Sequence, residues 1–101
     1  MERVMIVSSN HKFGVMLSEL ILSLFSPEIT IVQSGSEARR AHLHLEFDMV
    51  IINAPLSDEF GHELAMRIAE DSMTGVLLLT KAEVADSVSM KVEDNGIYVL
   101  G

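Results

Sequence analysis

The stretch Asp48-Met-Val-Ile-Ile-Asn53 decides the fold class of this 101-residue chain. Every interior position of the stretch is apolar, so it lacks the alternation of a strand that has one face in water. Strands that are apolar on both faces belong to parallel sheets with helices on both sides. The stretch therefore predicts a central strand of a parallel α/β sheet.

Strands and helices are expected to alternate on both sides of this strand. Short runs of apolar residues, rich in Val, Ile and Leu, predict four more strands, at 3–7, 29–32, 76–80 and 97–100. Apolar residues that recur three or four positions apart predict four helices, at 13–25, 36–45, around 64–68 and, more weakly, at 83–94. Asn10 and Ser36 are the residue types that cap the first two helices. The apolar stripe of the first helix contains Phe13, Leu17, Leu20, Ile21, Leu24 and Phe25.

This alternation predicts a five-stranded parallel sheet with right-handed crossovers and a three-layer α/β/α architecture in one domain, residues 1–101. Ligands of such sheets bind at the carboxyl ends of the strands, where the strand order reverses. The candidate site residues that follow the strands are Ser8, Ser9, Asn10, Asn53 and Thr80.

Composition and charge exclude several functions. The chain has 7 Lys and Arg against 15 Asp and Glu, a net charge of −8, and we expect no direct nucleic-acid binding by this domain. It has no cysteine, which excludes disulfides and thiolate metal sites. It also lacks an apolar run long enough to span a membrane and a signal peptide, so a soluble, cytoplasmic protein without membrane contact is expected.

Metal and nucleotide sites also lack support in the sequence. His42 and His44 are two positions apart, which on a helix places them on different faces, and His62 and Glu63 lie far along the chain. A zinc site is therefore not expected. No glycine-rich phosphate loop follows the first strand, and no cofactor is expected.

The pattern resembles the receiver domain of bacterial response regulators over essentially the whole chain. The most specific stretch is 48–53, followed by Pro55 and by Gly61, eight residues after Asn53. Receivers similarly open this strand with an acidic residue, close it with a phosphorylated aspartate and carry a glycine at the later offset. Residues 77–80 look like the strand that ends in the family's hydroxyl residue, and 96–99 look like its last strand. The resemblance implies a CheY-like, flavodoxin-like fold.

This sequence lacks the acidic residues that receivers use for phosphorylation. Its acidic pair after the first strand falls on Ser8 and Ser9, and its phosphoacceptor aspartate falls on Asn53. An amide is a poor nucleophile, and three neutral residues offer no carboxylate for Mg²⁺. Thr80 matches the family's hydroxyl residue, whereas the family's lysine would fall at or beyond Gly101. Both residues also have a purely structural interpretation. Thr80 is then an ordinary threonine at the end of a strand, and Asn53 forms hydrogen bonds that hold the next loop against the strand end.

Receivers also have a fifth helix, for which this sequence has no counterpart. Without it, one face of the last two strands would be bare, and Tyr98 and Leu100 become a candidate signalling face. Three explanations are open: the chain is a fragment of a longer regulator, it forms a homodimer through that face, or a protein partner supplies the helix. By analogy with longer regulators, an output domain outside these residues could bind RNA or DNA.

The sequence thus favours a non-phosphorylatable pseudo-receiver that acts by protein contact or dimerisation in gene regulation. The alternative is a small-ligand sensor that uses the neutral pocket at the carboxyl edge of the sheet. An enzyme is not favoured, because no activated nucleophile or base is assigned to the strand ends. Asp58 and Glu59 are expected in a solvated loop, and Arg39 and Arg40 on a solvated helix face.

Overall fold

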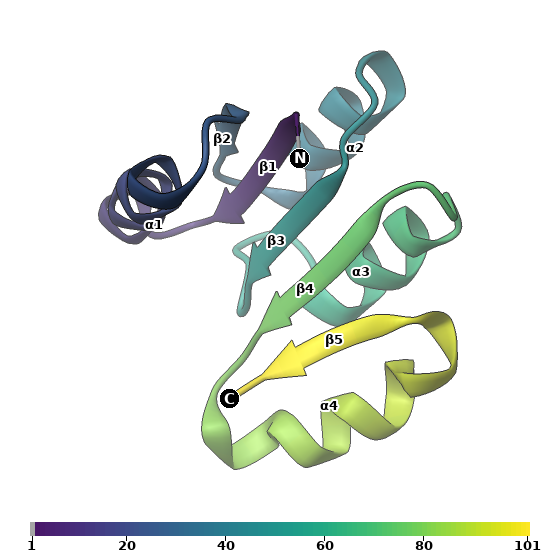
Figure 1. Cartoon of the computed structure of the whole chain (residues 1–101). Helices are drawn as coiled ribbons and strands as arrows, with labels where there is room; N and C mark the ends of the chain where they lie inside the picture. The colour runs from purple at the N-terminus through teal and green to yellow at the C-terminus, as the bar shows by residue number, and fades with distance from the viewer. Residues whose placement is uncertain (1) are drawn as a thin grey trace.

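The computed structural model describes residues 2–101 and shows a five-stranded, all-parallel sheet with the strand order β2-β1-β3-β4-β5 (Figure 1). Its strands are β1 Arg3–Ser8, β2 Glu28–Val32, β3 Met49–Asn53, β4 Gly75–Leu79 and β5 Ile97–Leu100. Its α-helices are α1 His11–Leu24, α2 Gly35–His44, α3 Gly61–Ala69 and α4 Ala85–Val92, with short 3₁₀ turns at Ala82–Val84 (η1) and Glu93–Asn95 (η2). The predicted α/β class and order of elements are confirmed.

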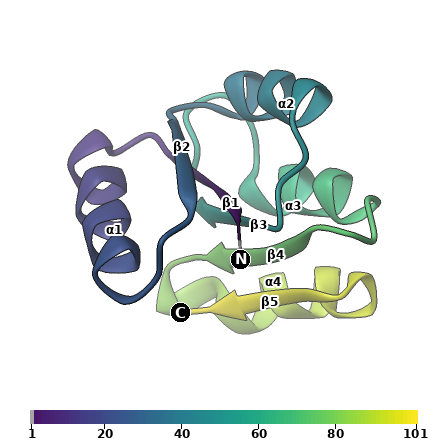
Figure 2. The same cartoon turned by 45° about the horizontal axis from the view of Figure 1, so that its top comes forward.

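Helices cover the two faces of the sheet unequally. α1 packs on β1 and β2, whereas α2, α3 and α4 lie on the opposite face (Figure 2). The larger core, between the sheet and α2–α4, includes Met5, Val50, Ile52, Leu64 and Leu78. The smaller core, beneath α1, is built on Val4, Ile6 and Ile51. Within residues 2–101 this is a three-layer α/β/α fold in which α1 is the one α-helix on its face.

The burial of the strands follows from this unequal cover. In β3, Val50, Ile51 and Ile52 are all buried, as predicted for a central strand. In β4, Val76 and Leu78 are buried beneath α3, while Leu77 and Leu79 on the other face are only partly buried. The difference arises because α1 lies over β1 and β2 and leaves this face of β4 uncovered.

The predicted stripe of α1 is partly wrong. Asn10 caps the helix as expected, since its Oδ1 accepts a hydrogen bond from the backbone N–H of Phe13 at 3.1 Å. The residues buried against the sheet are small: Gly14 and Ser18. A Cβ on Gly14 would lie 3.2 Å from Cγ2 of Ile31, so a larger residue would push the helix outward. Of the predicted stripe, Leu20, Leu24 and Phe25 are more than half exposed.

The cap of α2 also differs from the prediction. The helix begins one residue earlier than expected, and its N-cap is Ser34 rather than Ser36. Ser34 Oγ accepts a hydrogen bond from the N–H of Glu37 at 3.1 Å, and the Glu37 carboxylate accepts one from the N–H of Gln33 at 2.9 Å. This Ser-x-x-Glu arrangement is close to a capping box, in which serine and glutamate satisfy the free N–H groups of the helix start.

Asp48 connects the starts of β1 and β3 at the amino edge of the sheet. Its carboxylate accepts hydrogen bonds from the backbone N–H groups of Glu2 and Arg3, both at 2.9 Å. These bonds hold the pKa of Asp48 below its usual value. No helix within residues 2–101 has the length and apolar character needed to cross a membrane.

Candidate functional site

The carboxyl edge of the sheet brings two of the predicted site residues into direct contact. Ser8 and Asn53 end β1 and β3 and lie side by side in the sheet register. Asn53 Nδ2 donates a hydrogen bond to Ser8 Oγ at 3.2 Å. Parallel strands end at the same edge, which is why residues 45 positions apart in the chain meet here.

The Ser8 hydroxyl has no free hydrogen-bonding capacity. Its side chain is fully buried. The hydroxyl donates to the carbonyl oxygen of Asn10 at 2.8 Å and accepts from the N–H of Asn10 at 3.1 Å, besides the bond from Asn53. A hydroxyl offers one donor and two acceptor positions, so all three are used. The pair of Ser8 and Asn53 is therefore a closed, neutral arrangement that has no oxygen of Ser8 left for a ligand.

Ser9 has a different role from that of Ser8. Its hydroxyl donates to the carbonyl oxygen of Gln33 at 3.1 Å and accepts from the N–H of Ser57 at 3.0 Å. These bonds connect the loops that follow β1, β2 and β3. Ser9 thus holds three loops together at the carboxyl edge, beside the pair of Ser8 and Asn53 but not bonded to it.

Thr80 lies apart from the other predicted residues. It follows β4, which ends at Leu79, one residue earlier than predicted. The register partner of Asn53 in β4 is Leu79, and Thr80 donates its N–H to the carbonyl oxygen of Leu100 at 3.0 Å. Within residues 2–101 no hydrogen bond joins the Thr80 side chain to Ser8 or Asn53; instead Thr80 lines a cleft between α3 and α4.

The acidic loop after β3 is more ordered than the sequence suggested. The carboxylate of Asp58 accepts hydrogen bonds from the N–H groups of Gly35 at 2.8 Å and Ser36 at 3.0 Å, at the start of α2. These bonds lower the pKa of Asp58. Glu59 accepts two hydrogen bonds from the Arg39 guanidinium, at 2.9 and 2.6 Å. Asp58, Arg39 and Arg40 are exposed to solvent as predicted, whereas Glu59 is partly buried; the hydrogen bonds of Asp58 and Glu59 to α2 were not predicted.

Sequence reasoning missed these contacts because they join distant segments. The signal that could have found Asp58 is a helix start that lacks its full set of acceptors, since four N–H groups need partners there. The charge of Asp58 also suits the positive end of the helix dipole. The loop carboxylates are thus committed to α2 and are not directed at Asn53.

The chemistry available at the carboxyl edge is limited to neutral hydrogen bonding. Ser8, Ser9 and Asn53 supply hydroxyl and amide groups, whereas Mg²⁺ sites use one or two carboxylates. In the part of the chain that the structure describes, no three His, Asp or Glu side chains are grouped to hold a metal ion. These residues do not fit a divalent-metal site.

Tyr98 and Leu100 lie where the sequence placed a candidate signalling face. Their side chains are 74% and 55% exposed. In register beside them lie Leu77 and Leu79, which are partly buried and belong to the edge of the smaller core. We call these four residues the β4–β5 face. It is an apolar strip on the side of the sheet that carries α1, beyond the reach of that helix.

Comparisons with known proteins find similarity in structure. The sequence matches no protein-family model and no curated protein. The response regulator TrrA from Thermotoga maritima, in complex with Mg²⁺-BeF, has a TM-score of 0.84 at 22% identity, over 100% of this chain and 87% of that one.

Two further structures come from other organisms. The chemotaxis response regulator CheY4 of Vibrio cholerae has a TM-score of 0.83 at 20% identity, over 98% of this chain and 83% of that one. The signal receiver domain of an HD domain-containing protein from Pseudomonas fluorescens Pf-5 has a TM-score of 0.77 at 25% identity, over 97% and 72%. Together with the strand order β2-β1-β3-β4-β5, these likenesses show that the chain has the CheY-like receiver fold.

Proposed function

We propose that this chain is a pseudo-receiver: a two-component-like signalling module of receiver type that is not phosphorylated and works in the cytoplasm through protein contacts. The observation that carries the proposal is the closed pair of Ser8 and Asn53. At the positions where the resemblance places carboxylates, the chain has a neutral amide bonded to a fully engaged hydroxyl.

Phosphoryl transfer needs features that this pair lacks. The reaction depends on positioning and on positive charge that stabilises the transferring group, commonly Mg²⁺ held by carboxylates. The amide of Asn53 carries no charge, and its nitrogen already donates to Ser8. Asp58 and Glu59, the acidic side chains of the following loop, are bound to α2. A phosphodonor would therefore find neither a nucleophile nor a metal site at this edge.

Treatment with small phosphodonors tests this part of the proposal. The protein is incubated with acetyl phosphate or phosphoramidate, with and without Mg²⁺, and its intact mass is measured. We expect no mass increment. A Mg²⁺-dependent phosphoryl group that peptide mapping places on Asn53, Ser8 or Ser9 contradicts the proposal. The control is an active receiver in the same buffer, which must become labelled for the negative result to count.

The β4–β5 face is the proposed contact surface, and a second copy of the chain is its proposed partner. Monomeric proteins seldom expose contiguous apolar patches larger than a few hundred Å², and larger patches commonly mark interaction sites. Burial of apolar surface stabilises a contact by about 25 cal/mol per Å². The strip is continuous across two hydrogen-bonded strands, so the same residues of a second copy can pack against it around a two-fold axis.

Light scattering over a concentration series tests the contact. We expect a dimer that the double variant Tyr98→Ser/Leu100→Ser converts to a monomer. The matched control is Leu43→Ser on α2, because Leu43 is 81% exposed and lies in the opposite layer. A monomer at every concentration contradicts self-association, as does equal weakening of the dimer by the control.

The small-ligand alternative does not fit the pocket for which the sequence suggested it. The Ser8 hydroxyl has no capacity left, and Ser9 is bonded to two loops. No observation on this structure favours a ligand at that position, so we keep protein contact as the proposed function.

A further inference from the structure

The face of the sheet opposite α1 has a cleft that is separate from the pair of Ser8 and Asn53. It has a volume of about 450 Å³ and runs between α3 and α4, with Leu78 of β4 at its base. Its other apolar lining residues are Ala54, Pro55, Leu56, Phe60, Val84 and Val88. Small-molecule sites are clefts of roughly 300–1,000 Å³ that are mostly apolar and hold a few polar groups. The cleft has the size and the lining of such a site.

Cationic side chains flank this apolar lining. Lys81 precedes η1 and Lys91 lies in the last turn of α4, and both contribute to the cleft. They are ten residues apart on a largely helical segment, which separates them by about 15 Å. They are two of the three lysines in a chain of net charge −8. Neither forms an ion pair with any side chain that the structure describes.

Some of the other polar groups in the cleft already form hydrogen bonds or ion pairs within the protein, and others are free to bind a ligand. Glu59, the one carboxylate in the lining, is bound to Arg39 and its charge is thereby offset. Ser87 Oγ donates to the carbonyl oxygen of Val84 at 3.1 Å. The Thr80 hydroxyl forms no hydrogen bond within the described residues and lies at the same end as Lys81. A hydroxyl next to a lysine is a fitting pair of donors for an anionic oxygen.

We propose that this cleft binds a small organic anion with an apolar body, such as an aromatic or aliphatic carboxylate or sulfonate. The apolar body packs between Phe60, Val84 and Val88, and the anionic group binds Lys81 and Thr80 or, at the other end, Lys91. The acidic surface elsewhere repels anions, so the two lysines give the cleft its selectivity. Its volume fits one small molecule better than a folded partner, which would bury far more surface. This proposal goes beyond the proposed protein contact and does not depend on it.

A matched pair of fluorescent probes tests the proposal. Anilinonaphthalene sulfonate carries the required anion, and the neutral phenylnaphthylamine shares its rings without the sulfonate. We expect saturable binding of the sulfonate at one molecule per chain. The double variant Lys81→Gln/Lys91→Gln removes both alternative positions for the sulfonate and should weaken its binding roughly two- to five-fold, as expected for the loss of one exposed ionic contact. Binding of the neutral probe should change by less than about two-fold, because it forms no ionic contact.

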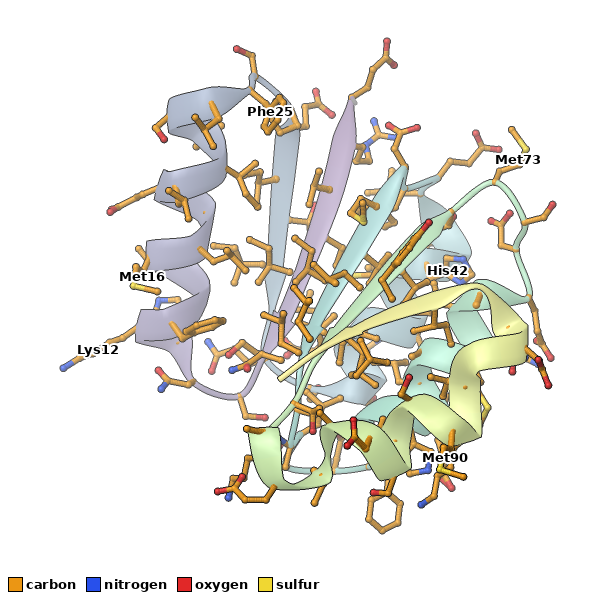
Figure 3. All side chains as sticks on the ribbon, turned by 60° about the horizontal axis from the view of Figure 1, so that its bottom comes forward. Lys12, Met16, Phe25, His42, Met73 and Met90 are labelled. Carbon is orange, nitrogen blue, oxygen red and sulfur yellow. The ribbon has the colours of Figure 1, made fainter. Side chains whose placement is uncertain are left out.

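Two control variants locate the probe. Lys12→Gln removes the same charge from α1, which lies on the other side of the sheet from Met90 of α4 (Figure 3). It should leave binding of the sulfonate unchanged, and so should Tyr98→Ser/Leu100→Ser on the β4–β5 face. The proposal is overturned if the cleft variant binds like the wild type or if Lys12→Gln weakens binding equally. Loss of binding in the β4–β5 variant overturns it too, since the probe would then occupy that face. Far-UV circular dichroism confirms that each variant is folded.

Discussion

The first helical position of α3 gives a sharp test of how the loop after Asn53 is held. A Cβ on Gly61 would lie 2.8 Å from the Cβ of Ala54 and 3.2 Å from Cδ1 of Leu78. Carbon atoms in favourable contact are roughly 3.5–4.0 Å apart, so Gly61→Ala creates an overlap. The Leu78 side chain can rotate away, but the backbone fixes the Cβ of Ala54. Either α3 or the loop must therefore move.

The cost of Gly61→Ala follows from two opposing effects. Overpacking of this kind costs about 1–3 kcal/mol. Alanine is favoured over glycine in a helix by at most about 1 kcal/mol. Because the clash with the fixed Cβ of Ala54 is close, we take the middle of the overpacking range, about 2 kcal/mol; the net loss in the free energy of unfolding is then about 1–2 kcal/mol, which lowers the Tm by roughly 4–16 °C in a domain of this size. Gly75→Ala is the control, because its Cβ would approach no heavy atom closer than 3.5 Å, and its stability should not fall.

Urea unfolding followed by circular dichroism measures the effect on four proteins: wild type, Gly61→Ala, Ala54→Gly and the double variant. Because the overlap is with the Ala54 methyl group, the double variant should be more stable than Gly61→Ala alone. The double-mutant cycle reports this coupling directly. A wild-type urea midpoint for Gly61→Ala would refute the reasoning, and so would a double variant that regains none of the lost stability.

Three further predictions concern individual hydrogen bonds. Backbone N–H groups at the start of α2 lower the pKa of Asp58. The ionised Asp58 therefore stabilises the folded state at pH values above the unfolded carboxyl pKa, and this stabilisation is lost as the pH falls through the folded pKa. Asp58→Asn should make stability fall less steeply in acid, as urea melts at several pH values would show; an unchanged acid slope contradicts this. Thr74→Val removes the hydroxyl that donates to the buried carbonyl oxygen of Phe47 at 2.8 Å. The free energy of unfolding measured in urea should fall by about 1–3 kcal/mol, and a wild-type midpoint would contradict a stabilising role for this bond. Ser8→Ala leaves Asn53 Nδ2 without its acceptor and should also cost about 1–3 kcal/mol, and a smaller loss would indicate that the amide finds another partner.

The strand pattern of the sequence was sufficient to predict the sheet. The apolar stretch 48–53 became β3, and it is buried on both faces because Val50 and Ile52 lie in the larger core and Ile51 lies in the smaller core beneath α1. The α1 stripe was predicted less well. Spacing identifies which residues share a helix face, but the depth of burial depends on where the neighbouring layer ends. The small residues Gly14 and Ser18 let α1 approach the sheet, and Leu20 and Leu24 are left exposed on its flank.

The candidate site was predictable only as far as strand register extends. Ser8 and Asn53 meet because each ends a parallel strand, and this follows from the sequence once the strands are placed. Thr80 lies one residue past β4, so alternation along the strand directs it away from Asn53 and into the cleft beneath α3 and α4. The bond from Asp58 to the start of α2 joins residues 23 and 22 positions apart through loops. No periodicity in the sequence specifies such a contact.

For the proposed signalling function, the hydrogen bonds of the carboxyl edge bear on where a signal could act. A ligand or modification shifts a conformational equilibrium only if it binds two states with different free energy. At this edge the Ser8 hydroxyl is fully engaged, Ser9 bridges two loops, and Asp58 is bound to α2. A group added there would first have to break bonds that cost about 1–3 kcal/mol each when left unmade. The β4–β5 face and the α3–α4 cleft, by contrast, present unengaged apolar or cationic groups. Under the proposed function, regulation should therefore act through the β4–β5 face and the cleft, and the hydrogen-bonded carboxyl edge should stay fixed.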